Sequence, residues 1–241
     1  MGRTFVLGDV HGAYRALVQV FERSGFNRRK DRLICLGDVA DRNPEVAECF
    51  TELLKVKDLV YILGNHDWWL LEWFREQKTE SMWLYQGGKY SIASYQKHSI
   101  RKQNSLIRKH RALLENAAYY YVDPQNRVFV HGGFDPARSI LDQVPAAGSD
   151  AIYIWDRKLF ETADICSLRS PARKFGGYCE IFVGHTSTMV TDAECKPLKL
   201  CNLRALDQGA GWGGKLTLMD ADTHEYWQSD WITMLYPEMV Y

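Results

Sequence analysis

Three short runs within the first 65 residues are mainly apolar, and each ends in a glycine followed by a polar residue. Runs of this length and composition are typical of strands that are buried on both faces. They are Thr4–Leu7 before Gly8-Asp9, Arg32–Leu36 before Gly37-Asp38, and Leu59–Leu63 before Gly64-Asn65. A chain that repeats this pattern is expected to build a sheet whose two faces are covered.

The segments between these runs predict helices. Residues 13–23 carry apolar side chains at helical spacing. Asn43-Pro44 predicts the start of the next helix, because Asn is a favoured N-cap and Pro fits the first helical turn. Strands that alternate with helices predict βαβ units and therefore a largely parallel sheet.

The character of the sequence changes after residue 76. Residues 77–116 are polar and helical in pattern, with many Lys and Arg side chains, and we interpret them as a helical insertion. No linker composition marks a domain boundary, so residues 1–241 are predicted to form a single domain. Further strands are predicted at residues 119–122, 127–130 and 180–183, followed by a hairpin of residues 215–219 and 225–228.

Composition excludes several classes of partner. Lys plus Arg is 30 and Asp plus Glu is 30, so the formal net charge is zero and a nucleic-acid partner is not expected. The longest apolar run, Ala117–Val122, is far shorter than the ~20 residues of a membrane helix, so no membrane partner is expected. The six cysteines are widely spaced and no export signal is evident, which predicts reduced thiols and a cytoplasmic location.

Polar side chains follow the carboxyl end of each predicted strand, where ligands bind in open α/β sheets. Their carboxylate, imidazole and amide groups suit manganese, iron or zinc better than magnesium or calcium. Six candidate ligands exceed the need of one ion, which favours a pair of ions sharing a carboxylate. The candidates are Asp9, His11, Asp38, Asn65, His131 and His185.

Five blocks of the sequence resemble the calcineurin-like metallophosphoesterases, most closely their bacterial serine/threonine phosphoprotein phosphatase branch. The blocks are Gly8-Asp9-Val10-His11-Gly12, Gly37-Asp38-Val39-Ala40-Asp41-Arg42, Gly64-Asn65-His66-Asp67, His131-Gly132-Gly133 and Gly184-His185-Thr186. Leu206-Asp207-Gln208-Gly209 and Lys215-Leu216-Thr217 are similar to the closing strands of that fold. The resemblance implies an α/β (α+β) fold, a β-sandwich flanked by helices (αββα).

The resemblance also implies a ligand set for two divalent ions, with manganese favoured and iron or zinc as alternatives. Asp38 would bridge the ions, and a hydroxide between them would attack phosphorus in line. Asp9, His11 and Asp38 would hold one ion, and Asp38, Asn65, His131 and His185 the other.

Further roles follow from the same resemblance. His66 would protonate the leaving oxygen, and Asp41 would orient and charge-stabilise His66. Arg42, Asn65 and Arg157 would bind phosphate oxygens, because a guanidinium fork matches a tetrahedral oxyanion. Arg157 belongs to Trp155-Asp156-Arg157, which resembles a Trp-x-Arg element of the bacterial branch.

The implied activity is hydrolysis of phosphomonoesters, by a serine/threonine or dual-specificity protein phosphatase or on a small phosphate ester. The sequence departs from the protein phosphatases at Leu63, where they usually carry Arg, and at Asn43, where they usually carry Gly. Gly64–Asp67 followed by Trp68-Trp69 is also similar to symmetrical dinucleoside tetraphosphatases, which usually have Ala at the position of Asp41.

Symmetrical dinucleoside tetraphosphate hydrolysis is therefore the alternative activity. A metal-binding scaffold without turnover is disfavoured, because such a protein could lose His66, Asp41 and Arg42 freely.

Three remaining features have a structural and a functional interpretation. The basic stretch at residues 97–111 is typical of a solvated helical face, but it could also attract an acidic substrate. Trp68, Trp69, Trp73 and Trp83 are expected to pack between insertion and core, or else to stack on a base. Residues 209–214 match Gly-x-Gly-x-x-Gly but precede a predicted strand, which indicates a β turn and not a dinucleotide site.

Overall fold

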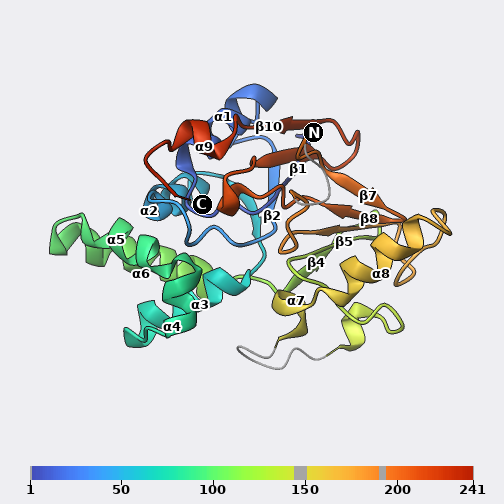
Figure 1. Cartoon of the computed structure of the whole chain (residues 1–241), viewed down its shortest axis with the longest axis horizontal. Helices are drawn as coiled ribbons and strands as arrows, with labels where there is room; N and C mark the ends of the chain where they lie inside the picture. Colours follow the sequence, from blue (N-terminus) through green and yellow to red (C-terminus); the bar gives the residue numbers. More distant parts are fainter. Residues whose placement is uncertain (1, 144–150, 190–193, 241) are drawn as a thin grey trace.

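The computed structural model describes residues 2–143, 151–189 and 194–240. Within these ranges the strands form two five-stranded sheets (Figure 1). One sheet has the order β10-β9-β1-β2-β3, with Tyr226–Gln228 as β10, Thr217–Asp220 as β9, Thr4–Leu7 as β1, Arg32–Cys35 as β2 and Asp58–Tyr61 as β3. The other has the order β4-β5-β6-β8-β7, with Tyr120–Val122 as β4, Arg127–Val130 as β5, Glu180–Val183 as β6, Leu203–Ala205 as β8 and Leu198–Leu200 as β7.

Both sheets are mixed. The strands β1, β2 and β3 are parallel, as are β5, β6 and β8, whereas β10, β9, β4 and β7 are antiparallel to their neighbours. The predicted parallel strands and the closing hairpin β9–β10 are therefore confirmed within one or two residues.

A core between the two sheets joins them into a sandwich. Val6 and Ile34 of the first sheet pack with Phe129 and Phe182 of the second, and the two phenyl rings stack at 4.9 Å. Phe5, next to Val6 in β1, belongs to the core on the other face of its sheet, because successive side chains of a strand point to opposite faces. The predicted mixed α/β sandwich is confirmed.

Helices cover the outer faces of the sandwich (Figure 1). The first sheet carries α1 (Tyr14–Ser24), α2 (Val46–Leu53) and α9 (Ile232–Leu235), and the second carries α7 (Ile152–Trp155) and α8 (Lys158–Ser167). Short 3-10 turns lie at Ile140–Asp142 (η2) and Ala210–Trp212 (η3). Each described helix is too short or too polar to cross a lipid bilayer.

The predicted start of α2 at Asn43-Pro44 is wrong. The helix begins at Val46 with Glu45 in the N-cap position. The Asn43 side-chain amide instead donates to the carbonyl oxygens of His11 (2.7 Å) and Ala210 (3.2 Å). A buried side chain that ties two loops together is not available to cap a helix, so tertiary contacts override the local preference of Asn.

Residues 77–116, which we call the helical segment, are mainly helical, as their pattern predicted, with breaks at 77–80 and 97–99. After α3 (Asn65–Glu76) the segment contains α4 (Ser81–Trp83), the π-helical turn η1 (Leu84–Gly88), α5 (Lys89–Gln96) and α6 (Ile100–Glu115). Figure 1 shows these helices gathered at one side of the molecule, opposite α8. The buried imidazole of His110 anchors α6, since its Nδ1 lies 2.8 Å from the Tyr95 hydroxyl and its Nε2 lies 3.2 Å from Thr51 Oγ1 of α2.

Candidate active site

Loops at the carboxyl ends of five strands bring the predicted metal ligands together. Each of the six side chains is at most 8% exposed. The loop after β1 carries Asp9 and His11, and the loops after β2, β5 and β6 carry Asp38, His131 and His185 in turn. Asn65 follows β3 as the first residue of α3. Parallel strands of both sheets thus present their polar ends to one place, as expected for this architecture.

Asp67 fixes two of these loops to each other. Its Oδ1 accepts from the backbone N–H groups of Val39 (3.0 Å) and Ala40 (3.1 Å) in the Asp38 loop. Its Oδ2 accepts from the Tyr61 hydroxyl (2.9 Å) and from the N–H of Gly64 (3.3 Å) at the start of α3. Burial and the nearby Asp38 charge raise the pKa of Asp67 to about 6. No role was predicted for Asp67 from the sequence, although it lies in one of the five blocks.

Potential ligand atoms in the described residues form two groups, each within 4.8 Å, that share Asp38. One group contains His11, Asp38 and His66, and the other contains Asp38, His131 and His185. Asp38 Oδ1 accepts from the His66 backbone N–H (2.9 Å), while Oδ2 lies 3.7 Å from His11 Nε2 and 3.4 Å from His131 Nε2. One oxygen of Asp38 therefore stands between the groups.

Asp9 and Asn65 stand beside these two groups. Asp9 Oδ2 accepts from the backbone N–H of His185 (3.0 Å), and Asn65 Oδ1 lies 3.1 Å from His131 Nε2. The structure thus places all six predicted ligands together, and it adds His66 to the group in which the resemblance had placed Asp9.

Two buried polar atoms at this place, Asp9 Oδ1 and His185 Nε2, have no hydrogen-bond partner. Such atoms cost free energy unless they are paired or coordinate a metal. Burial, followed by the charge of Asp207, raises the pKa of Asp9 well above its usual value. A cation beside the carboxylate would lower this pKa again. The buried carboxylate and the imidazole therefore fit a divalent metal ion.

The tautomers of two histidines fit the same interpretation. His11 Nδ1 lies 2.9 Å from the carbonyl oxygen of Ala40, and His131 Nδ1 lies 2.9 Å from that of Leu36. Each Nδ1 must carry the hydrogen that it donates to this oxygen, so Nε2 is the atom that would bind a metal ion in place of a proton.

The charges of the site are strongly linked. Burial alone would raise the pKa of Asp38, but His131 and His66 outweigh it and hold the pKa well below its usual value. Burial alone would lower the pKa of His131, but the Asp38 carboxylate raises it to about 9. Burial, with the neighbouring His66, lowers the pKa of His11 to about 3. Asp38 is therefore the anionic centre of the cluster.

The backbone of the site is strained. Ten non-glycine residues in the described ranges have positive φ, and five of them are predicted site residues. This left-handed region is sparsely populated by residues with a Cβ, and such strain clusters at functional sites. The five are His11 (48°), Asp38 (48°), Asp41 (73°), Arg42 (68°) and His185 (63°).

His66 and Asp41 form the hydrogen-bonded pair that the resemblance implied. His66 Nδ1 lies 2.6 Å from Asp41 Oδ2, and both side chains are buried. The His66 ring meets the Trp69 ring edge to face at 5.2 Å. With Nδ1 facing Asp41, the Nε2 atom of His66 is the one available to a substrate.

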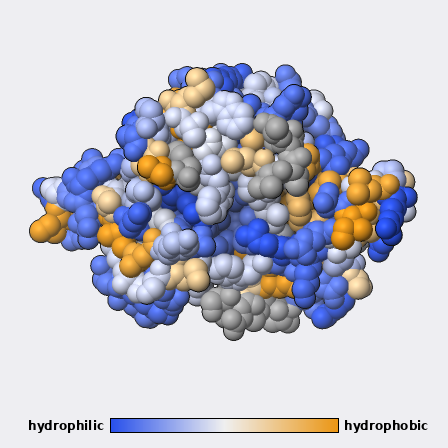
Figure 2. All heavy atoms as spheres, in the orientation of Figure 1, coloured by the Kyte–Doolittle hydropathy of each residue, from blue (hydrophilic) through white to orange (hydrophobic). Residues whose placement is uncertain are grey.

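A cleft of about 190 Å³ opens over this cluster, and the three predicted phosphate-binding residues Arg42, Asn65 and Arg157 line it. The Arg42 guanidinium lies 3.8 Å from the centre of the Trp212 ring and donates to Gln86 Oε1. Arg157 Nη1 donates to the carbonyl oxygen of His185 (3.0 Å). Figure 2 shows the same face of the molecule hollowed near its middle, with mainly hydrophilic residues around the hollow.

Five residues that were not predicted to belong to the site also line the cleft. Trp155 and Asp207 lie within motifs that carry the family resemblance, so the sequence could have assigned them to the site. Trp212 is brought to the cleft by the 3-10 turn η3, where a β turn had been predicted. Gln86 comes from the helical segment, and no sequence motif pointed to a place in the site. The five are Trp69, Gln86, Trp155, Asp207 and Trp212.

Other expectations about aromatic and basic residues are resolved by the same cleft. Trp73 and Trp83 are buried in the core, as expected for packing, whereas Trp69 lines the cleft. Among the described residues of the helical segment, Gln86 alone lines the cleft, so the basic stretch at residues 97–111 does not reach it.

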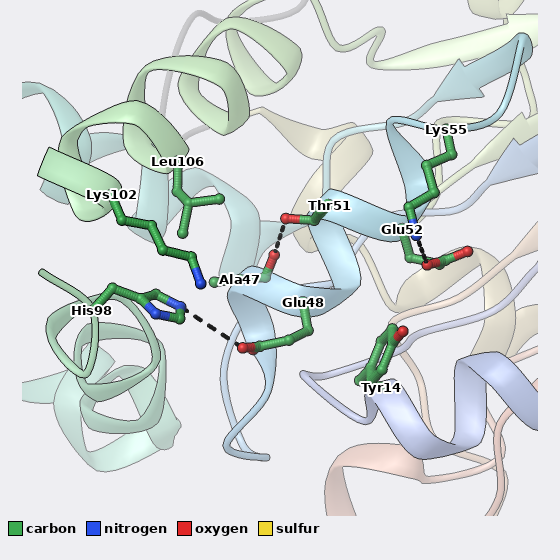
Figure 3. Close-up of a pocket in the computed structure, with 9 residues that line it drawn as sticks. All are labelled: Tyr14, Ala47, Glu48, Thr51, Glu52, Lys55, His98, Lys102 and Leu106. Carbon is green, nitrogen blue, oxygen red and sulfur yellow. Dashed lines mark hydrogen bonds and ion pairs between the residues drawn. The ribbon is translucent and has the colours of Figure 1, made fainter.

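A second pocket lies between α2 and α6 (Figure 3). Two acidic side chains contact basic ones there, since Glu48 lies 3.8 Å from His98 and Glu52 lies 2.6 Å from Lys55. These contacts join α2 to the helical segment and to the chain after α2. The lining residues are Tyr14, Ala47, Glu48, Thr51, Glu52, Lys55, His98, Lys102 and Leu106.

A family model described as calcineurin-like phosphoesterase matches residues 2–187. The chain belongs to the calcineurin-like phosphoesterase family. The matched range contains every predicted site residue, and the predicted membership is confirmed. This phosphoesterase is a hydrolase of a family that uses pairs of divalent metal ions.

Relatives of the phosphoesterase include two kinds of enzyme. Serine/threonine-protein phosphatase 1 of Salmonella typhimurium is 25% identical over 219 residues, which cover 89% of each chain. A symmetrical bis(5'-nucleosyl)-tetraphosphatase of Pseudomonas fluorescens is 27% identical over 271 residues, with 92% of each chain covered. A crystal structure of a proposed diadenosine tetraphosphatase has the same fold, with a TM-score of 0.60 at 18% identity over 94% of this chain and 92% of that chain.

Proposed function

We propose that this phosphoesterase hydrolyses phosphomonoesters, as a serine/threonine or dual-specificity protein phosphatase or on a small phosphate ester. The observation that carries the proposal is the bond of 2.6 Å between His66 Nδ1 and Asp41 Oδ2, beside the Asp38 cluster. A monoester with a poor leaving group needs a proton donor at the leaving oxygen, and this pair supplies one. The full-length similarity to a serine/threonine-protein phosphatase supports the same activity.

The proposed site would hold two divalent ions, with manganese favoured by the mixed donor set and iron or zinc as alternatives. When bound, the ions would act as Lewis acids and lower the pKa of a water toward neutrality. Asp38 would supply a carboxylate to both ions. Asp9 and His11 would complete one ligand set, and Asn65, His131 and His185 would complete the other.

The protein's own groups would act on the phosphate and on the leaving oxygen. Arg42, Asn65 and Arg157 line the cleft and would bind the phosphoryl oxygens, with a gain that grows as charge develops. His66 would donate its Nε2 proton to the leaving oxygen. Asp41 would hold the Nδ1–H and stabilise the protonated ring, as the carboxylate does in other catalytic pairs.

Symmetrical dinucleoside tetraphosphate hydrolysis is the second candidate function. Trp69, Trp155 and Trp212 all line the cleft, and indole rings stack on nucleobases. Trp69 and Trp155 already contact each other edge to face at 5.1 Å. The similarity to a symmetrical tetraphosphatase along 92% of the chain supports this candidate.

The two candidates are separated by their products. Protein reconstituted with manganese would be given phosphoserine and phosphotyrosine peptides and, in parallel, diadenosine tetraphosphate. Phosphate release from the peptides with the dinucleotide left intact supports the monoesterase. Conversion of the dinucleotide to adenosine diphosphate supports the second candidate, and metal binding without turnover of any substrate would leave only a scaffold.

A further inference from the structure

Asp41 receives most of its hydrogen bonds from the helical segment. Its fully buried carboxylate accepts from Trp83 Nε1–H at Oδ2 (2.8 Å) and from the Ser91 hydroxyl at Oδ1 (2.5 Å). The Asp41 backbone N–H donates in turn to Ser91 Oγ (2.9 Å). Trp83 ends α4 and Ser91 lies in the first turn of α5, so two helices converge on one carboxylate.

These contacts counter the local preference of the chain. Asp41 has a φ of 73°, which disfavours a residue with a Cβ unless the surroundings fix it. The bonds to Ser91 hold both the backbone and the carboxylate, and the bond to Trp83 sets the rotation of the carboxylate plane. The oxygen that accepts from Trp83, Oδ2, is also the oxygen that faces His66 Nδ1.

The segment between α4 and α5 is shaped for this close approach. The turn η1 is kinked at Gly87, whose φ and ψ are not helical. Gly87 has a φ of +108°, and a Cβ there would lie 2.7 Å from the backbone nitrogen of Arg42. A Cβ on Gly88 would lie 2.4 Å from the Trp83 ring. A side chain at position 87 would push the helical segment away from the Asp41–Arg42 loop, and one at position 88 would displace the Trp83 ring within the segment.

We propose that Trp83 and Ser91 are positioning residues for the Asp41–His66 pair, so that the helical segment supplies part of the proton-donating machinery. This inference rests on the proposed function, because it requires His66 to protonate the leaving oxygen. Two donors fix the Asp41 carboxylate in its orientation, and the carboxylate then holds the Nδ1–H tautomer of His66. Loss of either donor loosens His66 Nε2 relative to the leaving oxygen.

The test compares two substrates that differ in leaving group. Trp83→Phe keeps a buried ring and removes the indole N–H, and Ser91→Ala removes the hydroxyl. Each variant is expected to lose about tenfold more kcat on phenyl phosphate than on p-nitrophenyl phosphate, because the better leaving group needs less proton donation. Trp73→Phe, a buried tryptophan that contacts Phe74 and Tyr95 instead of Asp41, is the matched control and should affect both substrates equally.

A double-mutant cycle keeps the test valid if a variant is less stable. In an Asp41→Asn background, Trp83→Phe and Ser91→Ala should cost little further activity on phenyl phosphate, because the group that they position is already lost. Equal losses on both substrates, or full additivity with Asp41→Asn, would show that Trp83 and Ser91 only stabilise the fold and would overturn the inference.

His66→Asn separates this failure from a failure of the proposed function. If His66→Asn is selective for phenyl phosphate while the Trp83 and Ser91 variants are not, the positioning role fails alone. If His66→Asn lowers both rates equally, His66 is not the proton donor, and the inference falls together with that part of the proposed function.

Discussion

The two sides of the cleft are built in different ways. The predicted metal ligands stand on short loops at strand ends, where two sheets fix the backbone and each ligand sits within a short sequence block. The proton-donating side depends on Asp41, whose partners Trp83 and Ser91 come from a helical segment 42 and 50 residues further along the chain. The metal-ligand side of the cleft is therefore encoded in short sequence blocks, whereas the proton-donating side depends on tertiary contacts.

The largest expected effect is on the sheet side. Asp38→Asn removes the carboxylate shared by both ligand groups, so the variant should bind less metal and lose at least on the order of 10³ in kcat, since metal ions generate the nucleophile in such sites. Metal content by elemental analysis and initial rates on p-nitrophenyl phosphate measure both effects. Full metal occupancy in Asp38→Asn would contradict the bridging position.

His66→Asn should have the opposite profile. Both metal ions should stay bound, while kcat on phenyl phosphate falls by about 10² or more, within the range for general acids. The loss on p-nitrophenyl phosphate should be smaller. If metal content fell as it does in Asp38→Asn, His66 would act as a ligand, as its place in the His11–Asp38 group allows, and the division of the cleft into two sides would be wrong.

The sheet side could be predicted from the sequence because its chemistry is local. Each ligand follows an apolar run that must become a buried strand, and parallel strands bring their carboxyl ends together whatever lies between them. The order of the blocks then sufficed to place Asp9, Asp38 and His185 in one cluster. The strand limits were also accurate within one or two residues, as for Glu180–Val183.

The helical side could not be predicted in the same way. Helical periodicity identified residues 77–116 as helical, but periodicity does not say which polar side chain on a helix meets which loop. Trp83 was expected to pack, and it does, yet its indole N–H also bonds Asp41. The prediction that Asn43 caps a helix was wrong for the same reason, because its amide donates to the His11 and Ala210 carbonyl oxygens instead.

Arg42 connects the two sides and gives the next prediction. Its guanidinium lies between Trp212 and Gln86, so it contacts both the loop before β9 and the helical segment. Arg42→Ala should lower kcat/KM on p-nitrophenyl phosphate by about 10², in the range for removal of one donor to a transition-state oxyanion. Arg75→Ala, which breaks surface ion pairs with Glu72 and Glu115, is the control and should leave the rate unchanged.

An unchanged rate in Arg42→Ala would mean that the phosphate is held from the sheet side alone. If KM rises and kcat does not change, Arg42 binds the substrate and the transition state equally well. A loss in kcat would place it in the transition state, as proposed.

The smallest expected effect concerns how the helical segment stays in place at low pH. Burial lowers the pKa of His110 to about 3 in the folded protein, against 6.5 for an ordinary histidine. Below pH 6.5 the unfolded chain binds a proton at His110 that the folded chain does not bind. The free energy of unfolding therefore falls by about 1.4 kcal/mol per pH unit, or by about 2 kcal/mol at pH 5. Above pH 7 both states hold the neutral imidazole and the contribution vanishes.

His110→Gln should be less stable than the native chain at pH 8, because the contacts with Tyr95 and Thr51 are weakened, but it should lose less stability between pH 8 and pH 5. The measurement is the free energy of unfolding by urea at both pH values, without added metal. The difference between the two proteins cancels the titration of the Asp38 cluster, which is common to both. If the free energy of unfolding falls equally in both proteins between pH 8 and pH 5, His110 binds its proton within the folded protein. Acid would then destabilise the sheet side of the cleft and not the helical side.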